Sequence, residues 1–219
     1  MIRISQIKLP AEHTRGQLEK KIEKILHNTS YKTWSIYKRS IDARRKDSIA
    51  YVYAVNVEME EEQEKAFLKK NRNRKIIHVS DRKYQFPKTG TWTGHPPVII
   101  GMGPAGMFAA LMLARAGLRP VVLERGQAVE QRTRDVETFW KTGKLNTESN
   151  VQFGEGGAGT FSDGKLNTLV KDKFGRNRFV LETFVEFGAP EEVLYDAKPH
   201  IGTDLLCRIV ARIRKEITD

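Results

Sequence analysis

The sequence contains one cysteine, Cys207, in 219 residues. A single cysteine excludes an intramolecular disulfide, and it excludes the paired thiols of a zinc ribbon or a dithiol redox site. An unbroken apolar run of about 20 residues, the length of a membrane span, is also missing. One uncharged stretch, residues 96–114, is interrupted by three glycines and a proline, which favours a strand, a turn and a helix. The N-terminus lacks the apolar core of a secretory signal, so we expect a cytoplasmic protein with no membrane partner.

Acidic residues are scarce in the first part of the chain. Residues 1–100 hold 21 Lys and Arg against 11 Asp and Glu, so they carry +10 of the total net charge of +11. Such a surface attracts anions, and nucleic-acid binding by the basic N-terminal region, with the nucleotide site as regulation, is therefore an alternative function. Tyr51 and Tyr53 lie two apart on a predicted strand, but the Gly-aromatic signature of RNA-recognition domains is absent. We favour an ordinary basic surface over nucleic-acid binding.

Periodicity in residues 1–88 predicts six elements in the order β-α-β-β-α-β, the ferredoxin-like arrangement. The expected strands are residues 2–9, 31–41, 48–59 and 74–79, and the expected helices are residues 14–28 and 60–71. Residues 89–96 are rich in Pro, Gly and Thr and indicate a linker. We therefore expect a basic α+β domain at 1–88 and a second domain at 97–219.

The second domain is expected to open with a strand, a glycine-rich turn and a helix. The apolar strand 98–100 leads directly into G-x-G-x-x-G, formed by Gly101, Gly103 and Gly106. A helix is expected from Pro104 to about residue 116, with Phe108, Leu111 and Met112 spaced to face the sheet. A second apolar strand, 121–123, ends at Glu124. This order is that of a dinucleotide-binding βαβ unit.

Each glycine of the turn has a predicted role. Gly101 permits the tight turn, Gly103 lets a pyrophosphate approach the backbone, and Gly106 lets helix and strand pack closely. The start of the helix, including Ala105, offers free N–H groups to the phosphates. Glu124 follows Gly106 by eighteen residues and can accept hydrogen bonds from the adenosine ribose, which disfavours NADP at this site. The pattern by itself fits NAD and FAD equally.

A second glycine-rich stretch, "GEGGAGTFSDGK", spans residues 154–165. Gly159 to Lys165 also spells G-x-x-x-x-G-K, the start of a phosphate-binding P-loop. Position 166 is Leu, where a P-loop needs a hydroxyl for Mg²⁺, and the preceding "NVQF" is too short and polar for a buried strand. A second contact to the dinucleotide is the interpretation that we favour.

Four stretches carry a family resemblance: "GMGPAGMFAALMLARAG", "VVLERG", "NVQFGEGGAGTFSDGKLNT" and "KPHIGTDLL". Over residues 97–219 the chain resembles the predicted bacterial FAD-dependent dehydrogenases of the glutathione-reductase-like flavoprotein superfamily. The resemblance implies an α/β protein with a Rossmann-type FAD-binding domain, and an oxidoreductase that transfers a hydride or electrons through the flavin to an unknown small-molecule substrate. NAD(P)H is a compatible electron donor. Members are longer, which implies that this chain is an N-terminal fragment with an incomplete FAD-binding domain.

The resemblance also implies which residues bind FAD. Residues 154–165 would lie along the pyrophosphate, ribityl chain and flavin, and Arg132 would offset the pyrophosphate charge, although a solvated helix face is the alternative for Arg132. Lys165 would lie near the flavin or be an ordinary surface lysine, and His200 would be an acid–base group or a turn residue. No catalytic residue and no metal site is assigned. The candidate cofactor-binding residues are Gly101, Gly103, Pro104, Ala105, Gly106, Glu124, Arg125, Arg132, Gly156, Gly157, Ala158, Gly159, Thr160 and Lys165.

Overall fold

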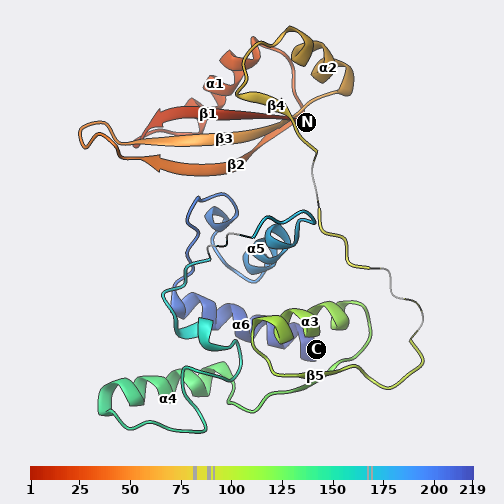
Figure 1. Cartoon of the computed structure of the whole chain (residues 1–219), viewed down its shortest axis with the longest axis vertical. Coiled ribbons are helices and arrows are strands. Elements are labelled where there is room, and N and C mark those ends of the chain that lie inside the picture. The colour runs from red at the N-terminus through yellow and green to blue at the C-terminus, as the bar shows by residue number, and fades with distance from the viewer. Residues whose placement is uncertain (81–82, 88–89, 91, 167, 169) are drawn as a thin grey trace. The chain divides into compact units, whose positions relative to one another are not determined.

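The computed structural model describes residues 1–80, 83–87, 90, 92–166, 168 and 170–219. The protein is mixed α/β, with a four-stranded antiparallel sheet and a two-stranded parallel sheet (Figure 1). It divides into two compact units, called here the N-terminal unit (Met1–Lys83, Asp172–Gly175 and Glu191–Pro199) and the C-terminal unit (Tyr84–Lys171, Arg176–Pro190 and His200–Asp219). Positions 89 and 91 of the expected linker lie outside the described residues.

The N-terminal unit has the six elements that periodicity predicts. They are β1 (Ile2–Pro10), α1 (Arg15–Leu26), β2 (Thr33–Asp42), β3 (Ala50–Glu58), α2 (Glu61–Lys70) and β4 (Ile76–His78). The strand order across the sheet is β2-β3-β1-β4, and every neighbouring pair is antiparallel. Figure 1 shows β2 and β3 as a long hairpin beside β1. Both helices contribute apolar side chains to one core on the sheet.

A β-bulge in β1 keeps the apolar residues of this strand in the core. Ile2 and Ile4 precede the bulge, and Ile7 and Leu9 follow it, so strict alternation along the sequence is broken by one residue. Gln6 has a φ of 63°, which absorbs the extra residue. All four apolar side chains are therefore buried although their spacing is irregular.

A later segment of the chain pairs with the edge of β2. The backbone N–H of Arg39 donates to the carbonyl of Tyr195 at 2.7 Å, and the N–H of Ala197 donates to the carbonyl of Arg39 at 2.8 Å. The Arg39 guanidinium also binds the Asp196 carboxylate through two hydrogen bonds of 2.6 and 2.9 Å. These bonds raise the pKa of Arg39 above its ordinary value. Residues 191–199 are thus a part of the N-terminal unit that sequence patterns do not reveal.

The C-terminal unit contains a short parallel sheet and four α-helices among its described residues. Its elements are β5 (Val98–Ile100), α3 (Pro104–Arg115), β6 (Val121–Leu123), α4 (Val129–Thr142), the 3₁₀ turn η1 (Ala158–Phe161), α5 (Arg176–Glu186) and α6 (Thr203–Thr218). Strands β5 and β6 are in parallel register from Val98 opposite Val121 to Ile100 opposite Leu123. The strand, turn, helix and strand that the sequence predicts for residues 98–123 are therefore present.

Of the three residues that helical spacing predicts to face the sheet, Leu111 is buried, and Phe108 and Met112 are partly buried. Met107, Ala110 and Leu111 are buried, whereas Phe108 is half-exposed and its ring packs against Phe184 of α5 at a centroid distance of 5.7 Å. The reason is that α3 contacts β5 and β6 and also lies against α6, so its apolar surface has more than one neighbour. The prediction is therefore confirmed for Leu111, and the contact with α6 adds buried residues that it did not include.

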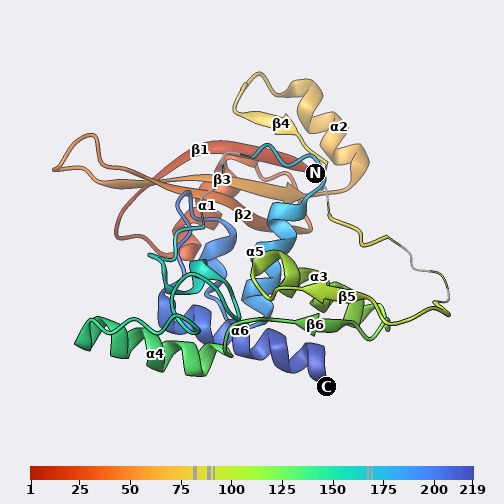
Figure 2. The ribbon, with the colours of Figure 1, turned by 60° about the horizontal axis from the view of Figure 1, so that its bottom comes forward.

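The parallel sheet is covered on one face only. Four alternating residues, Val98, Ile100, Val121 and Leu123, are 61%, 87%, 44% and 55% exposed. Figure 2 shows β5 and β6 side by side next to α3. Parallel strands are normally buried on both faces, and this sheet departs from that rule because one of its apolar faces is exposed. Among the described residues no helix is long and apolar enough to cross a membrane.

Candidate functional site

The glycine turn after β5 has the backbone that its sequence predicts. Gly101 has a φ of 94°, a conformation that side chains rarely allow, and its N–H donates to the carbonyl of Leu123 at 2.7 Å. A Cβ on Gly106 would lie 2.0 Å from the carbonyl oxygen of Gly101. Both glycines are therefore required by the fold itself, because they join the strand, the turn and α3 at close range.

Gly103 differs from these two glycines because the fold does not require it. A Cβ there would have the Gly157 Cα at 4.0 Å as its nearest neighbour, an ordinary contact, and its φ of −69° suits any residue. Gly103 is the N-cap of α3, no side chain caps that end, and Pro104 and Ala105 are exposed. The start of the helix, with its positive dipole end, is thus open on the side where Gly103 lacks a side chain.

The Glu124 carboxylate lies at this turn. Its Oε2 accepts the N–H of Met102 at 2.5 Å, and its Oε1 accepts the N–H of Gly126 at 2.8 Å. Each carboxylate oxygen has a second lone pair, so both can accept a further hydrogen bond. Arg125, the next residue, is exposed and its guanidinium lies 4.7 Å from the centroid of the Phe153 ring.

The second glycine-rich segment packs directly on this turn. The N–H of Gly156 donates to the carbonyl of Met102 at 2.8 Å. A Cβ on Gly157 would meet Pro104 Cδ at 2.9 Å and Gly103 Cα at 3.3 Å, and Gly157 has a φ of 72°. The structure therefore brings together two motifs that are about fifty residues apart in the sequence.

The remaining predicted residues of this segment differ in exposure. Ala158 and Gly159 are exposed, and a Cβ on Gly159 would have no atom within 4 Å. Thr160 is 1% exposed, and its N–H donates to the carbonyl of Gly157 at 3.4 Å. Within the described part of the chain its Oγ1 has no hydrogen-bond partner. The N–H of Thr160 is therefore already used within the chain.

Arg132 is buried, not on a solvated helix face. It is 0% exposed, although it lies in the otherwise polar sequence of α4. Its guanidinium donates to four backbone carbonyls of the described residues, those of Asn150, Val151, Glu155 and Gly157. Burial lowers the pKa of Arg132, and the nearby negative charges of Glu124 and Glu155 oppose that shift. Arg132 therefore binds the backbone of the glycine-rich segment and of the residues just before it.

Glu155 is a buried carboxylate that sequence reasoning missed. It is 3% exposed, and its Oε2 accepts the N–H of Val129 at 2.7 Å and a hydrogen bond from Arg214 Nη1 at 2.6 Å. Burial raises the pKa of Glu155, against the lowering effect of these two donors. Its Oε1 has no hydrogen-bond partner among the residues that the structure describes. The signal for it is a lone acid within an otherwise uncharged glycine run, between Phe153 and Phe161.

Lys165 is exposed to solvent. Its Nζ pairs with Asp163 at 2.7 Å, an interaction that raises the pKa of Lys165, and its backbone bridges to His200. Among the described residues, Asp163 and His200 are the partners of Lys165, and neither is a candidate cofactor-binding residue. Residues 151–157 form bends and turns, and the described residues after Lys165 form no helix before Arg176. A P-loop needs both a strand before and a helix after, so that interpretation lacks its structural context.

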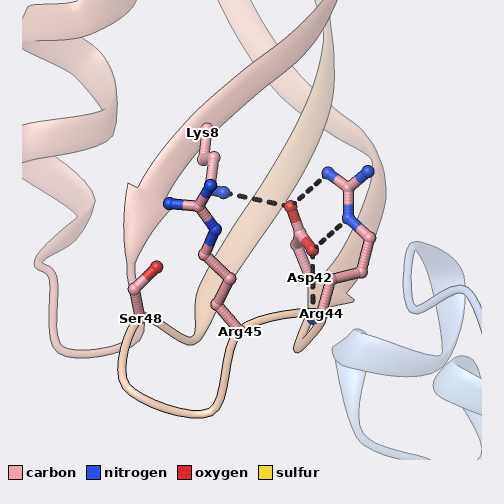
Figure 3. Close-up of a pocket in the computed structure, with 5 residues that line it drawn as sticks. All are labelled: Lys8, Asp42, Arg44, Arg45 and Ser48. Carbon is pink, nitrogen blue, oxygen red and sulfur yellow. Dashed lines mark hydrogen bonds and ion pairs between the residues drawn. The ribbon is translucent and has the colours of Figure 1, made fainter.

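The N-terminal unit contains a basic cavity of about 450 Å³ at the end of the β2–β3 hairpin. Figure 3 shows Asp42 between Lys8 and Arg44, with Arg45 and Ser48 completing the wall. Asp42 accepts hydrogen bonds from Arg44 and, at 3.0 Å, from Lys8, and both hold the pKa of Asp42 well below its usual range. A carboxylate thus already occupies the space between two of the three cations.

Two parts of the chain match models of known protein families. Residues 96–138 match the family model described as an FAD binding domain. This range includes the glycine turn, Glu124 and Arg132, and it ends before the second glycine-rich segment. The match supports a flavin-binding role. Residues 1–58 match a domain of unknown function, DUF8436.

A relative covers the whole chain. An uncharacterized protein of Clostridium beijerinckii (strain ATCC 51743 / NCIMB 8052) is 48% identical over 219 residues, which are 99% of this chain and 40% of the relative. The chain thus spans less than half of the length of that relative. Membership of the glutathione-reductase-like superfamily stays a prediction.

The residues present fit an FAD dinucleotide. Gly103 and Gly159 are the two candidate glycines that have no positive φ and at which a Cβ would meet no described atom closer than 4.0 Å. Packing among the described residues does not require a glycine at either position, whereas the backbone approach of a dinucleotide would. In the part of the chain that the structure describes, no group of three His, Cys, Asp or Glu could hold a metal ion.

Proposed function

We propose that the protein is an FAD-dependent oxidoreductase. In this proposal residues 97–219 are the first part of a Rossmann-type FAD-binding domain, residues 1–88 are a basic ferredoxin-like domain, and residues 89–96 are the linker. The family match over residues 96–138 supports the cofactor. The order β-α-β-β-α-β with sheet order β2-β3-β1-β4 supports the ferredoxin-like arrangement.

One observation carries the proposal: two glycine segments and a carboxylate meet where the backbone is open. Gly157 lies against Gly103 and Pro104, and the Glu124 carboxylate accepts the N–H of Met102 in the same turn. A diphosphate needs N–H donors and close backbone approach, and the ribose needs an acceptor. The start of α3 supplies the N–H donors, and Glu124, which follows β6 and binds Met102, supplies the acceptor.

The chain's own residues would bind and orient the cofactor. The first N–H groups of α3, at Ala105 and Gly106, would donate to the diphosphate, and Glu124 would accept the ribose hydroxyls. Ala158 and Gly159 are exposed beside the turn and would contact the part of FAD beyond the diphosphate. Bound FAD would supply hydride or electron transfer. We propose NAD(P)H as the donor and a small molecule as the substrate, and we assign no catalytic side chain.

The test is a pair of helix N-cap substitutions. Gly103 caps α3 and Gly202 caps α6, both have ordinary φ values, and both have space for a Cβ. A valine costs each helix about the same, on the order of 1 kcal/mol. We expect Gly103→Val to abolish FAD binding in a fluorescence titration, and Gly202→Val to bind FAD like the unchanged protein. Gly159→Val is expected to weaken binding as well.

Two outcomes contradict the proposal. The first is an unchanged protein that binds no FAD at millimolar concentration, in contrast to the micromolar or tighter affinities typical of cofactors. The second is a Gly103→Val variant that binds FAD as tightly as the Gly202→Val variant. Equal melting temperatures of the two variants keep the comparison free of differences in folding.

The alternative of nucleic-acid binding has no comparable observation. Tyr53 is 4% exposed and its hydroxyl hydrogen-bonds His13 Nε2 at 3.0 Å, so its ring is not available for stacking on a base. Tyr51 packs edge-on against His13 and lies 5.3 Å from the Arg39 guanidinium. The basic charge of residues 1–100 is the remaining support, and it carries no second function by itself.

A further inference from the structure

The glycine-rich segment folds around the side chain of Arg132. Nη1 donates to the carbonyls of Glu155 (2.5 Å) and Gly157 (3.1 Å). Nη2 donates to the carbonyls of Asn150 (3.2 Å) and Val151 (3.4 Å), and Nε donates to Asn150 as well (3.4 Å). A guanidinium has five N–H donors, and here every one has a backbone acceptor. A phosphate could bind Arg132 only after one of these bonds was broken.

Packing around the side chain leaves it no direct route to a ligand. Arg132 is 0% exposed, and its guanidinium lies 4.8 Å from the centroid of the Phe161 ring. A Cβ on Gly154 would lie 2.5 Å from Arg132 Cδ, and a Cβ on Gly126 would lie 2.5 Å from Gly154 Cα. These glycines therefore make room for Arg132 and for the loop around it, not for a cofactor.

Gly157 connects Arg132 to the candidate site. Its carbonyl accepts a hydrogen bond from Arg132. A Cβ on Gly157 would meet Gly103 and Pro104, so its α-carbon packs against the turn. The neighbouring Gly156 donates to the carbonyl of Met102 in the same turn. The position of residues 156–159 beside the turn thus depends on the guanidinium beneath them.

We propose that Arg132 is a positioning residue for FAD, which holds residues 150–161 against the Gly103 turn and does not touch the cofactor. This inference rests on the proposed function. It concerns the flavin and ribityl portion of FAD, because that portion would lie along the segment that Arg132 supports. The adenosine diphosphate portion would bind the turn and Glu124. Among the described residues these accept no hydrogen bond from Arg132, and Glu124 acts on the guanidinium through its charge alone.

The test compares FAD with ADP on the same variants. Arg132→Lys keeps the charge but has three donors on one nitrogen, and Arg132→Met removes both charge and donors. We expect each to weaken FAD by about tenfold or more, the equivalent of one or two lost hydrogen bonds, and to change ADP affinity by less than about twofold. Arg134→Met, on the exposed side of the same helix, is the control and is expected to change neither.

The ratio of the FAD affinity to the ADP affinity distinguishes a positioning role of Arg132 from direct phosphate contact and from a purely structural role. Direct contact between Arg132 and the phosphates predicts that ADP and FAD weaken together, that Arg132→Lys retains more binding than Arg132→Met, and that the loss shrinks at high salt. A purely structural role predicts parallel loss of both ligands with loss of folded protein. Either result overturns the inference, and so does unchanged FAD affinity in both variants.

A milder variant covers the case in which the Arg132 variants do not fold. Phe161→Leu removes the ring that lies against the guanidinium and leaves the carbonyl acceptors in place. We expect the same selective loss of FAD, on the order of threefold, since a cation–π contact contributes less than the hydrogen bonds do. Equal loss of FAD and ADP in Phe161→Leu would contradict the inference. Failure of the unchanged protein to bind FAD would instead contradict the proposed function.

Discussion

The two glycine-rich segments of the C-terminal unit look alike in sequence, yet their glycines serve different purposes. In the first, Gly101 and Gly106 are required by the backbone and Gly103 is left open. In the second, the Cβ position of most glycines is occupied by another part of the chain, such as Arg132, Pro104 or the Thr160 side chain. At Gly159 no described atom lies within 4 Å of that position. The comparison teaches that glycine density does not locate a ligand. The informative glycine is the one whose missing side chain nothing in the protein replaces.

The largest loss of stability is expected where an added Cβ would clash with the backbone. Gly106→Ala places a Cβ 2.0 Å from the Gly101 carbonyl oxygen, which must move. We expect a loss of about 3 kcal/mol in the free energy of unfolding of the C-terminal unit. Gly103→Ala, three residues earlier, is the control and should cost less than about 1 kcal/mol, the difference between Gly and Ala as N-caps. Denaturant unfolding followed by circular dichroism measures both, and equal losses would erase the distinction between required and open glycines.

A smaller effect is expected at the carboxylate beside the turn. Glu124→Ala should weaken FAD and ADP together by about tenfold, or about 1.4 kcal/mol, because the ribose hydroxyls lose their acceptor. The unchanged protein should bind ADP more tightly than 2′-deoxy-ADP, and the variant should bind the two equally. Calorimetric titration measures these affinities, with Glu148→Ala, which alters an exposed carboxylate near Arg125, as the control. A preference for ADP that survives in Glu124→Ala would remove Glu124 from the site.

The smallest effect is a pH dependence in the second segment. Because burial raises the pKa of Glu155, protonation favours the folded state. The resulting stability is fully present below the ordinary pKa of about 4.5 and is lost as the pH rises through the raised pKa of the folded protein. Glu155→Gln should lack this dependence. The free energy of unfolding of the unchanged protein relative to Glu155→Gln, measured from pH 4 to 8, should therefore fall as the pH rises. A difference that stays constant with pH would contradict the burial effect.

The fold of the first hundred residues follows from local patterns, since helical and strand periodicity are properties of neighbouring residues. The roles of Gly101 and Gly106 could be predicted for the same reason, as the contacts involved lie within one βα unit. The meeting of Gly157 with Gly103, and the pairing of Tyr195–Ala197 with β2, could not. Both join residues far apart in the sequence, for which short-range spacing holds no information.

Arg132 shows a further limit of sequence reasoning. It lies among Glu130, Gln131, Thr133 and Arg134, a polar surrounding that indicates solvent. Its burial depends on five hydrogen bonds to carbonyls of residues 150–157, and a pattern of side chains does not encode backbone acceptors. Glu155 was missed for a similar reason, because its partners are the start of α4 and Arg214 of α6.

The open face of β5 and β6 affects how this protein can be assayed. Val98, Ile100, Val121 and Leu123 offer an apolar surface in the fully folded state. Fluorescent dyes such as ANS, which are used to detect molten globules, bind exposed apolar surface. Their signal with this chain would therefore be high before any heating, and a thermal-shift assay should follow intrinsic tryptophan or flavin emission instead.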